Sequence, residues 1–304
     1  MAALDGWTIG FIGLGLMGRP MTENLLAAGA TVVGYNRSQV VIKELSASGL
    51  RPTRSPSEVA KAADTVILML PDTDTVQQIL LGEQGVVGDL QADALVIDMG
   101  TTAIMATRRF ASTVADADGH YVDAPVSGGA VGARDATLSI MVGGSPEAFD
   151  RAEPIFKVLG RNISHVGDVS AGQVAKTVNQ VIVGLTIGAV SEALVLAETA
   201  GVDPAKVRDA LIGGFATSRI LELHGKRMID DNFEPGGRAK TQRKDMFEAT
   251  EFASTLGIEL PALNLNLELY DKLLDRGWGD LDHSALYKLI KDLQKSCSTN
   301  STTA

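Results

Sequence analysis

Three glycines near the start of the chain have the spacing of a dinucleotide-binding turn. Gly13, Gly15 and Gly18 follow a short apolar run, Trp7 to Ile12, and precede a helical pattern at Pro20–Ala28. In this context the first glycine permits a tight turn, the second lets the backbone approach a pyrophosphate, and the third allows close helix–strand packing. The helix N-terminus then faces the phosphates. The sequence predicts cofactor binding by Gly13, Leu14, Gly15, Leu16, Met17 and Gly18; the alternative is a glycine-rich turn without a ligand.

The residues after the second apolar run indicate which dinucleotide binds. Asn36, Arg37 and Ser38 follow Thr31–Tyr35, and positions 35 to 38 contain no carboxylate. An NAD site usually places Asp or Glu here to accept hydrogen bonds from the ribose 2′-hydroxyl group. The planar guanidinium of Arg37 suits a 2′-phosphate instead. We therefore expect NADP in preference to NAD, although NAD remains possible and Arg37 could be an ordinary solvated charge.

Lys176 is the only charged residue between Ala171 and Ser191. Burying a lysine is costly unless it is paired or functional, and desolvation lowers its pKa. Such a lysine can act as a general acid. Asn179 and Gln180 stand three and four residues later and share its helix face. The alternative is a lysine whose stem packs at a surface while its ammonium group stays solvated.

A second candidate site is the run from Asp123 to Gly129, with the sequence DAPVSGG. Ser127, Gly128 and Gly129 expose successive backbone N–H groups, which can hold a carboxylate without a positive side chain. An ordinary turn between a strand and a helix is the alternative.

The composition restricts the class of protein. The chain has 304 residues, 45% of them hydrophobic, and a net charge of −10. No basic stripe is visible, which disfavours nucleic-acid binding. The single cysteine, Cys297, excludes a disulfide framework, and the histidines show no metal-ligand spacing, so we expect no metal. No signal peptide is visible, and we expect a cytoplasmic protein.

The first part of the chain alternates short apolar strands with helical patterns, which predicts an α/β, doubly wound parallel sheet. Ligand-binding loops are expected at the carboxyl ends of its strands, at Leu70–Asp72, Gly100–Thr102 and Pro125–Gly129. The expected strands are Thr8–Ile12, Thr31–Tyr35, Thr65–Leu70, Leu95–Asp98, Tyr121–Asp123 and Leu138–Val142.

The second part of the chain reads as all-α. Residues 171–200 predict one helix of about 45 Å, at 1.5 Å per residue. Its middle, Val181–Val190, is apolar on every side and is expected to be buried. Lys176, Asn179 and Gln180 leave too short an apolar run for a membrane span. We expect a dinucleotide-binding domain at residues 1–167, a helical substrate and oligomerisation domain at 168–304, and a disordered tail from Ser296.

Taken together, these motifs resemble those of the β-hydroxyacid dehydrogenase family, over nearly the whole chain and in the family's order. The matching segments are GLGLMGRPM at Gly13–Met21, DAPVSGG at Asp123–Gly129, GQVAKTVNQ at Gly172–Gln180, KD at Lys244–Asp245 and DHSAL at Asp282–Leu286. Within the family, the chain is most similar to the branch that reduces tartronate semialdehyde.

The resemblance implies a Rossmann-type domain followed by a helical one, and an NAD(P)-dependent oxidoreductase. Lys176 would be the general acid, and Ser127, Gly128, Gly129, Asn179 and Gln180 would bind the substrate. Beyond the glycine-rich turn and Asn36 and Arg37, the cofactor would contact Leu70, Pro71, Thr101 and Lys244. Gln180 stands where many members have Asn, so the division of roles between Asn179 and Gln180 stays open.

The resemblance also implies a substrate class. The substrate would be a small aldehyde acid such as tartronate semialdehyde, reduced to glycerate. The alternatives are 3-hydroxyisobutyrate dehydrogenase activity and reduction of succinic semialdehyde or glyoxylate. A non-catalytic cofactor sensor would need the glycine-rich turn but not Lys176. The apolar segment Val181–Val190 suggests more buried surface than one helical half can cover, so we expect a homodimer or homotetramer formed through the helical domain. We expect no nucleic-acid or membrane partner.

Overall fold

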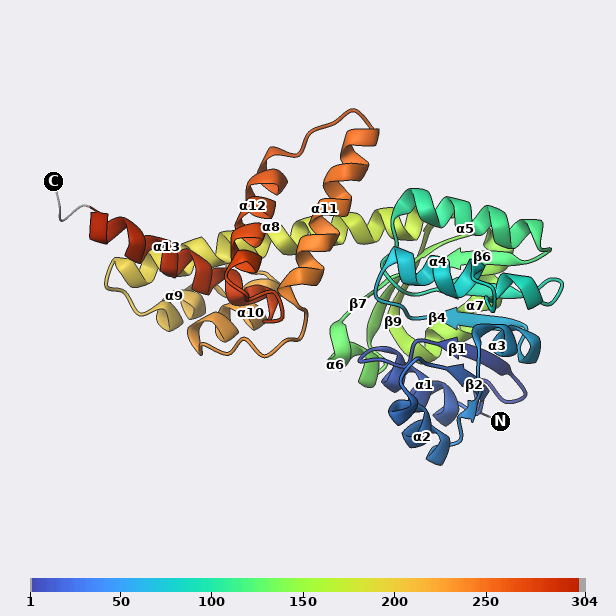
Figure 1. The fold of residues 1–304 in the computed structure, drawn as a ribbon. Helices are drawn as coiled ribbons and strands as arrows, with labels where there is room; N and C mark the ends of the chain where they lie inside the picture. Colours follow the sequence, from blue (N-terminus) through green and yellow to red (C-terminus); the bar gives the residue numbers. More distant parts are fainter. Residues whose placement is uncertain (1, 301–304) are drawn as a thin grey trace. The chain divides into compact units, whose positions relative to one another are not determined.

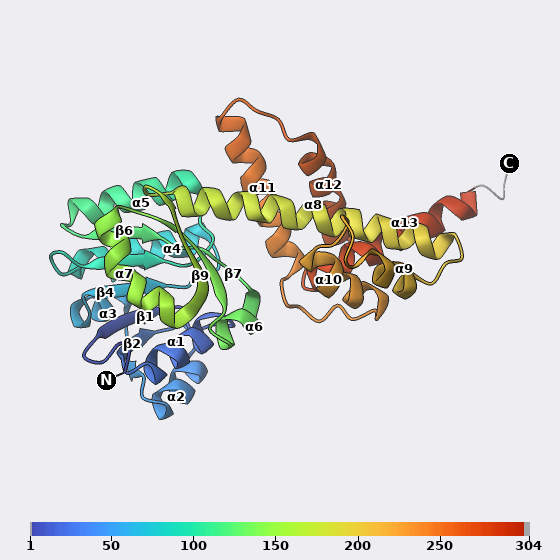
Figure 2. The same ribbon diagram turned by 180° about the vertical axis from the view of Figure 1, so that it is seen from behind.

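The computed structural model describes residues 2–300. The chain divides into two compact units that meet in sequence between Lys176 and Thr177 (Figures 1 and 2). This point lies inside a helix that begins at Ala171, whereas the sequence suggested a division at residue 167. The two units are described separately.

The first unit contains a nine-stranded sheet within the described residues, in the order β3-β2-β1-β4-β5-β6-β8-β7, with β9 paired to β8. Neighbouring strands in the run β3-β2-β1-β4-β5-β6 are parallel. Strand β8 runs antiparallel to β6 and β7 and parallel to β9. The strands are β1 (Thr8–Ile12), β2 (Thr31–Tyr35), β3 (Arg51–Pro52), β4 (Thr65–Leu68), β5 (Leu95–Asp98), β6 (His120–Asp123), β7 (Val126–Ser127), β8 (Leu138–Gly143) and β9 (Gly160–Gly167).

Helices cover both faces of this sheet (Figures 1 and 2), which confirms the predicted doubly wound α/β class. One hydrophobic core contains side chains of α3 (Pro56–Ala62), α4 (Thr73–Leu81) and α5 (Ile104–Asp116). A second contains side chains of α1 (Gly18–Ala27), α2 (Gln39–Ala47), α6 (Gly129–Arg134) and α7 (Pro146–Leu159). A 3₁₀ turn, η1 (Val87–Asp89), follows α4. The apolar strands between these helices are buried on both faces, as parallel sheets require.

The second unit is helical, as predicted. It contains the greater part of α8 (Ala171–Thr199), followed by α9 (Pro204–Leu211), α10 (Arg219–Ile229), α11 (Ala239–Thr255), α12 (Pro261–Asp275), η2 (His283–Ala285) and α13 (Leu286–Asn300). Asn266 of α12 donates a buried hydrogen bond to the carbonyl oxygen of Gly184 on α8, at 2.8 Å. A Cβ on Gly188 would lie 2.6 Å from the Asn266 side chain, so this glycine permits the close approach of the two helices.

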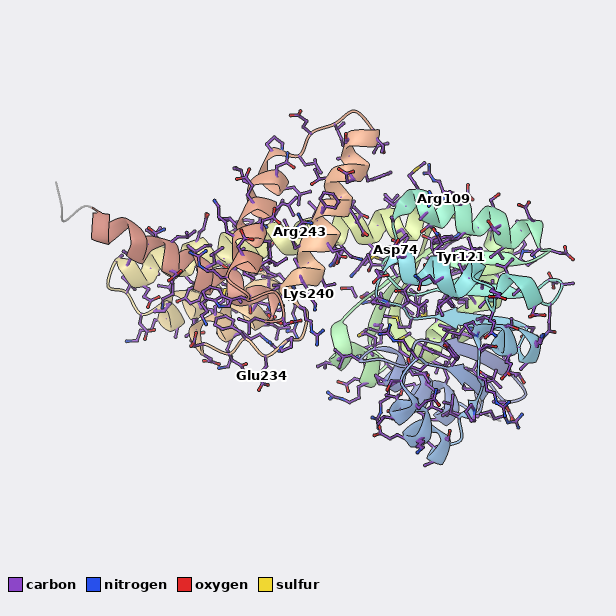
Figure 3. All side chains as sticks on the ribbon, viewed as in Figure 1. Asp74, Arg109, Tyr121, Glu234, Lys240 and Arg243 are labelled. Atoms are coloured by element: carbon purple, nitrogen blue, oxygen red, sulfur yellow. The ribbon has the colours of Figure 1, made fainter. Side chains whose placement is uncertain are left out.

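Two charged residues labelled in Figure 3, Lys240 and Arg243, extend from α11. Lys240 pairs with Asp280 at 2.7 Å, and Arg243 pairs with Asp271 at 2.7 Å. These side chains are partly or fully exposed, and exposed ion pairs contribute little to stability. The packing of the unit therefore depends on its buried groups.

Within the single chain, the segment Val181–Val190 is not buried on every side. Ile182 is 60% exposed and Ala189 is also exposed. Among the described residues, α8 alone is long and apolar enough to cross a membrane by length and composition, and 33% of its most apolar window is buried. The apolar stretch that Lys176, Asn179 and Gln180 leave in α8 is therefore longer than we expected from the sequence.

The expectation of a disordered tail from Ser296 is partly wrong, because α13 continues to Asn300. The last four residues of the chain, 301–304, lie outside the described residues.

A fully buried carboxylate, Asp282, ties together several segments of the helical unit. Its Oδ1 accepts hydrogen bonds from the N–H and hydroxyl groups of Ser284, at 3.1 and 2.6 Å. Its Oδ2 accepts hydrogen bonds from the N–H groups of Gly236 and Gly237, at 2.9 and 3.2 Å. Arg227 on α10 lies 3.3 Å from Oδ2. Asp282 thereby fixes the loop before α11 to the start of η2.

Two histidines, His224 and His283, complete this cluster, although the histidines show no metal-ligand spacing in the sequence. Nδ1 of His224 lies 3.4 Å from Asp282 Oδ1, and the Nε2 atoms of His224 and His283 are 3.3 Å apart. These three residues offer potential metal-ligand atoms within 4.8 Å of one another. However, four N–H and O–H donors already occupy the Asp282 oxygens, which use the lone pairs that a cation would need. We therefore interpret the cluster as structural.

Replacing Asp282 by Asn should destabilise the helical unit. Burial opposes ionisation, but the close approach of His224, the hydrogen bonds from Ser284 and the nearby His283 outweigh it and lower the pKa of Asp282 well below its ordinary value. Its contribution to stability is therefore present above pH 4 and is lost as the pH falls below that point. We expect Asp282→Asn to lower the free energy of unfolding at pH 7 by about 3–5 kcal/mol, measured by denaturant unfolding.

The control is Asp280→Asn, which removes a 74%-exposed carboxylate paired with Lys240 and Arg238. This change should have little effect. Equal stability of the two variants, or an acid unfolding curve of Asp282→Asn that matches the wild type, would contradict the assigned role of Asp282.

Candidate active site

The glycine-rich turn has the geometry that its sequence predicts. Gly13 has a φ angle of +98°, and a Cβ there would collide with the carbonyl oxygen of Met69. A Cβ on Gly18 would collide with the carbonyl oxygen of Gly13. An added Cβ on Gly15 has no atom within 4 Å. The fold itself requires Gly13 and Gly18, whereas Gly15 borders open space, which suits the close approach of a pyrophosphate.

Asn36 connects this turn to the end of β2. Its Oδ1 accepts a hydrogen bond from the N–H group of Leu14 at 3.0 Å, and its Nδ2 donates to the carbonyl oxygen of Ser38 at 3.1 Å. Arg37, the next residue, is exposed and makes no hydrogen bond or ion pair with the residues that the structure describes. It therefore follows a fixed residue beside the turn, with its guanidinium available to a ligand.

The loops after β4 and β5 lie against each other. A Cβ on Gly100 would lie 2.7 Å from the carbonyl oxygen of Leu70. Leu70 is buried, whereas Pro71 is exposed and Thr101 is half-buried. Asp72 accepts a hydrogen bond from the N–H group of Thr75 at 2.8 Å and so caps α4. The predicted cofactor residues Leu70, Pro71 and Thr101 are thus brought to the same edge of the sheet as Gly13.

Asp98, the last residue of β5, shapes the loop that carries Thr101. The buried carboxylate accepts hydrogen bonds from the N–H group of Gly100 at 3.0 Å and the Thr102 hydroxyl at 2.6 Å. It also accepts one from the hydroxyl of Tyr121, labelled in Figure 3, at 3.1 Å. Burial, followed by the charges of Asp98 and Asp123, raises the pKa of Tyr121 well above its ordinary value. Tyr121 is therefore a fixed hydrogen-bond donor to Asp98.

The side chain of Asp123, the last residue of β6, contacts the start of α8. Its Oδ1 accepts a hydrogen bond from the N–H group of Ser170 at 2.7 Å, and its Oδ2 accepts one from the N–H group of Gln173 at 2.8 Å. The first N–H groups of a helix lack partners within the helix, so Asp123 supplies acceptors from a distant strand. Burial raises the pKa of Asp123 to about 7, although these two hydrogen bonds act in the opposite direction.

The side chain of Gln173 binds the loop after β5. Its Nε2 donates to the carbonyl oxygen of Gly100 at 2.9 Å, and its Oε1 accepts from the N–H group of Thr102 at 3.1 Å. Gln173 is 1% exposed. The loop around Thr101 and the first turn of α8 are thus joined by buried hydrogen bonds.

Lys176 follows three residues later on α8 and is 8% exposed. The expectation of a buried lysine on this helix is therefore confirmed. Ser127 ends the short strand β7, and Gly128 and Gly129 follow with φ angles of +135° and +62°. These two glycines are exposed and Ser127 is half-buried, so their backbone groups border solvent at this end of the sheet.

Three predicted site residues of the helical unit lie around one buried carboxylate. Asp245 on α11 accepts a hydrogen bond from Nε2 of Gln180, and Gln180 in turn accepts one from Asn179 at 2.8 Å. Lys244 Nζ lies 3.2 Å from Asp245 and 3.5 Å from Glu248. Burial opposes the charge of Lys244, but these two carboxylates outweigh it and raise the pKa of Lys244. Both polar atoms of the Gln180 amide are thus used within the protein.

No motif in the sequence indicated a role for Asp98, Tyr121 or Gln173. A weak signal was present, because Asp98 and Asp123 each end an apolar strand with a charged residue. A carboxylate that is buried at a strand end needs donors, and these donors come from segments far away in sequence. Their identity became visible only in the folded chain.

Comparison with known proteins places this site in a family. Residues 8–167 match the family model for the NAD binding domain of 6-phosphogluconate dehydrogenase. Residues 170–290 match the model described as NAD-binding of NADP-dependent 3-hydroxyisobutyrate dehydrogenase. Fold, turn geometry and these matches define an NAD(P)-dependent oxidoreductase.

Individual relatives narrow the class. The 2-hydroxy-3-oxopropionate reductase of Escherichia coli (strain K12) is 44% identical over 287 residues, which cover 93% of this chain and 97% of the relative. The NAD-dependent L-serine dehydrogenase of Pseudomonas aeruginosa is 32% identical over 94% of this chain and 98% of its own. The structure of Mycobacterium tuberculosis 3-hydroxyisobutyrate dehydrogenase with L-serine superposes with a TM-score of 0.85, at 30% identity over 94% of this chain and 99% of that chain. The chain belongs to the β-hydroxyacid dehydrogenase family.

The raised pKa of Asp123 predicts an unusual pH dependence of stability. Between pH 4 and pH 7 the folded chain keeps a proton on Asp123 that the unfolded chain, with a pKa near 3.8, has released. Stability therefore falls as the pH rises through this range, by an amount on the order of 4 kcal/mol from this residue. Replacement by Asn, which does not titrate, isolates the effect.

The measurement is denaturant unfolding of wild type and Asp123→Asn at several pH values from 4 to 8. The difference in unfolding free energy between the two proteins should shift in favour of the Asn variant as the pH rises. A difference that stays constant across the range would contradict the shifted pKa.

Proposed function

We propose that this chain is an NADP-preferring reductase of small aldehyde acids, with tartronate semialdehyde as substrate and glycerate as product. The observation that carries the proposal is a buried lysine, Lys176, on a helix fixed to the carboxyl ends of β5 and β6. The 2-hydroxy-3-oxopropionate reductase of Escherichia coli, 44% identical to this chain, supports the choice of substrate.

The residues divide the reaction between binding and proton transfer. When bound, the reduced nicotinamide supplies a hydride to the aldehyde carbon. Lys176 donates a proton from Nζ to the carbonyl oxygen, where negative charge develops, so that the aldehyde becomes an alcohol. Ser127, Gly128 and Gly129 hold the substrate carboxylate through a hydroxyl group and backbone N–H groups. In the helical unit, Asn179 and Gln180 are the candidates for substrate binding, and we assign Lys244 to cofactor binding.

Between the two amides, Asn179 is the better candidate for a direct substrate contact. Gln180 uses its Nε2 on Asp245 and its Oε1 on Asn179. A substrate at Gln180 would compete with these hydrogen bonds at both polar atoms of the amide, whereas among the described residues Asn179 uses only its Nδ2. We therefore assign Gln180 to holding Asn179 and Asp245.

The preference for NADP rests on Arg37. Its exposed guanidinium follows Asn36, which is fixed to the glycine-rich turn, and no carboxylate stands at positions 35 to 38. The relatives include an enzyme named NAD-dependent and a family described as NADP-dependent, so the comparisons do not choose between the two cofactors.

Other members of the family define the second candidate function. A relative from Dictyostelium discoideum, 33% identical, is named a probable 3-hydroxyisobutyrate dehydrogenase. This activity would use the same lysine and carboxylate-binding loop in the opposite direction. Succinic semialdehyde, glyoxylate and tartronate semialdehyde assayed with NADPH, and 3-hydroxyisobutyrate assayed with NADP⁺, separate the candidates by the change in NADPH absorbance.

We further propose a cytoplasmic homodimer or homotetramer that assembles through the helical unit. Ile182, Ala189 and Leu196 are exposed on α8 at intervals of seven residues, which places them on one face of the helix. An apolar face of this kind favours burial against a second copy. The single cysteine gives the chain no need of an oxidising compartment.

Arg37→Ala should weaken NADPH binding far more than NADH binding. The lost charged hydrogen bonds to the 2′-phosphate correspond to about 1.5–3 kcal/mol. Fluorescence titration of both cofactors measures the effect. Arg109→Ala, which removes another exposed arginine of the same unit, is the control and should bind both cofactors normally. Equal losses for NADPH and NADH in Arg37→Ala would remove the basis for the preference.

Lys176→Ala should lower turnover by about 10²- to 10⁴-fold, the range for a positioned general acid. Cofactor affinity should change little, because the phosphates bind at the glycine-rich turn. Lys176→Arg keeps the charge but does not readily release a proton, and it should also be poorly active.

The control for Lys176 is Lys157→Ala, which removes a lysine paired with Glu153 on α7. Near-normal turnover of Lys176→Arg would show that only the charge is needed. Full activity of Lys176→Ala would contradict the role of Lys176 as general acid and favour the cofactor-sensor alternative.

A further inference from the structure

Two hydrogen-bonded contacts fix the start of α8 to the sheet of the first unit. Asp123 accepts from two N–H groups of the helix start, Ser170 and Gln173, at 2.7 and 2.8 Å. Gln173 then uses both atoms of its amide group on the loop after β5, accepting from Thr102 and donating to Gly100. Gln173 therefore takes part in both contacts, one through its backbone and one through its side chain.

The surrounding packing leaves little freedom at this junction. A Cβ on Gly143 would lie 2.6 Å from Asp123 Oδ1 and from the backbone nitrogen of Gly172. A Cβ on Gly172 would lie 2.8 Å from Asp123 Oδ2. Ser170, with a φ angle of +79°, accepts a hydrogen bond from Arg108 on α5 at 3.0 Å. Asp123, Ser170 and Gln173 are each at most 3% exposed.

The backbone of α8 connects this junction to Lys176. Lys176 stands three residues after Gln173, a rise of about 4.5 Å along the axis. The same Gln173 holds the backbone on both sides of Thr101. A change in either hydrogen bond of the Gln173 side chain would therefore alter the separation between Lys176 and the loop of Thr101.

We propose that Gln173 and Asp123 are positioning residues that hold Lys176 in register with the loop of Thr101. Neither residue is assigned a contact with substrate or cofactor. Their contribution to turnover is made through Lys176. This inference rests on the proposed function, in which Lys176 is the general acid and Thr101 contacts the cofactor.

A double-mutant cycle separates positioning from general structural damage. Gln173→Met keeps the length of the side chain and removes both of its hydrogen bonds. In the wild-type background it should lower kcat by about 10- to 100-fold, as expected for a displaced catalytic group. In the Lys176→Ala background the same change should lower kcat by less than about 3-fold, because the residue to be positioned is gone.

Asp123→Asn is the second variant, since it keeps the shape of the side chain and turns one acceptor into a donor. It should show the same dependence on Lys176. The matched control is Gln91→Met, whose amide group donates to the carbonyl oxygens of Ala60 and Lys61, at 3.3 and 3.1 Å, away from α8. Gln91→Met should leave kcat unchanged in both backgrounds.

Amide hydrogen exchange supplies a readout that does not depend on turnover. Gln173→Met should accelerate exchange in the peptides that contain residues 99–104 and 170–176, whereas Gln91→Met should not. Unchanged exchange in both peptides would overturn the proposal, whatever the substrate.

The double-mutant cycle also distinguishes failure of the positioning role from failure of the proposed function. Equal fold-losses from Gln173→Met in both backgrounds, or no loss in the wild-type background, would overturn the positioning role while Lys176 remains the acid. Full activity of Lys176→Ala with Gln173 intact would overturn the proposed function, and the positioning role with it.

Discussion

The first unit depends on one constraint, the burial of a helix start against the carboxyl ends of two strands. A helix start carries N–H groups without partners, and burying them without acceptors is costly. Asp123 supplies the acceptors for Ser170 and Gln173, at 2.7 and 2.8 Å. Once this contact is made, the side chain of Gln173 faces the loop after β5 and satisfies that loop's backbone. The positions of Lys176 and Thr101 follow from the same set of hydrogen bonds.

Close approach along α8 is achieved with glycines in both units. In the first unit, Gly172 leaves space for Asp123 at the helix start. In the second, Gly184 and Gly188 leave space for Met246 on α11 and Asn266 on α12. A β-carbon on Gly172 would collide with backbone oxygens, so its neighbours require a glycine there. A β-carbon on Gly184 or Gly188 would lie within 2.8 Å of side-chain atoms, which would have to shift. These glycines of α8 therefore mark where other elements pack against the helix.

The sequence was sufficient for features set by local pattern and insufficient for those set by distant partners. Strands β1, β2 and β5 have the bounds that their apolar runs predicted. Strand β9 was not predicted, because residues such as Arg161, Asn162 and His165 interrupt any apolar run and most of the strand is exposed. The glycine-rich turn and Lys176 could be identified from residue type and spacing. The partners of Asp123, 47 and 50 residues away, could not, because no local pattern records which buried donors meet a given carboxylate.

The acidity of the chain and its anionic cofactor are compatible because charge acts locally. At physiological ionic strength, exposed charges are largely screened beyond about 8 Å. The net charge of −10 therefore has limited influence at the edge of the sheet where the cofactor residues lie. The two buried carboxylates close to that edge are occupied by donors: Asp98 by Gly100, Thr102 and Tyr121, and Asp123 by Ser170 and Gln173. Overall charge disfavours one class of partner, nucleic acid, whereas under the proposed function directed hydrogen bonds from the backbone and individual cations such as Arg37 select the ligand.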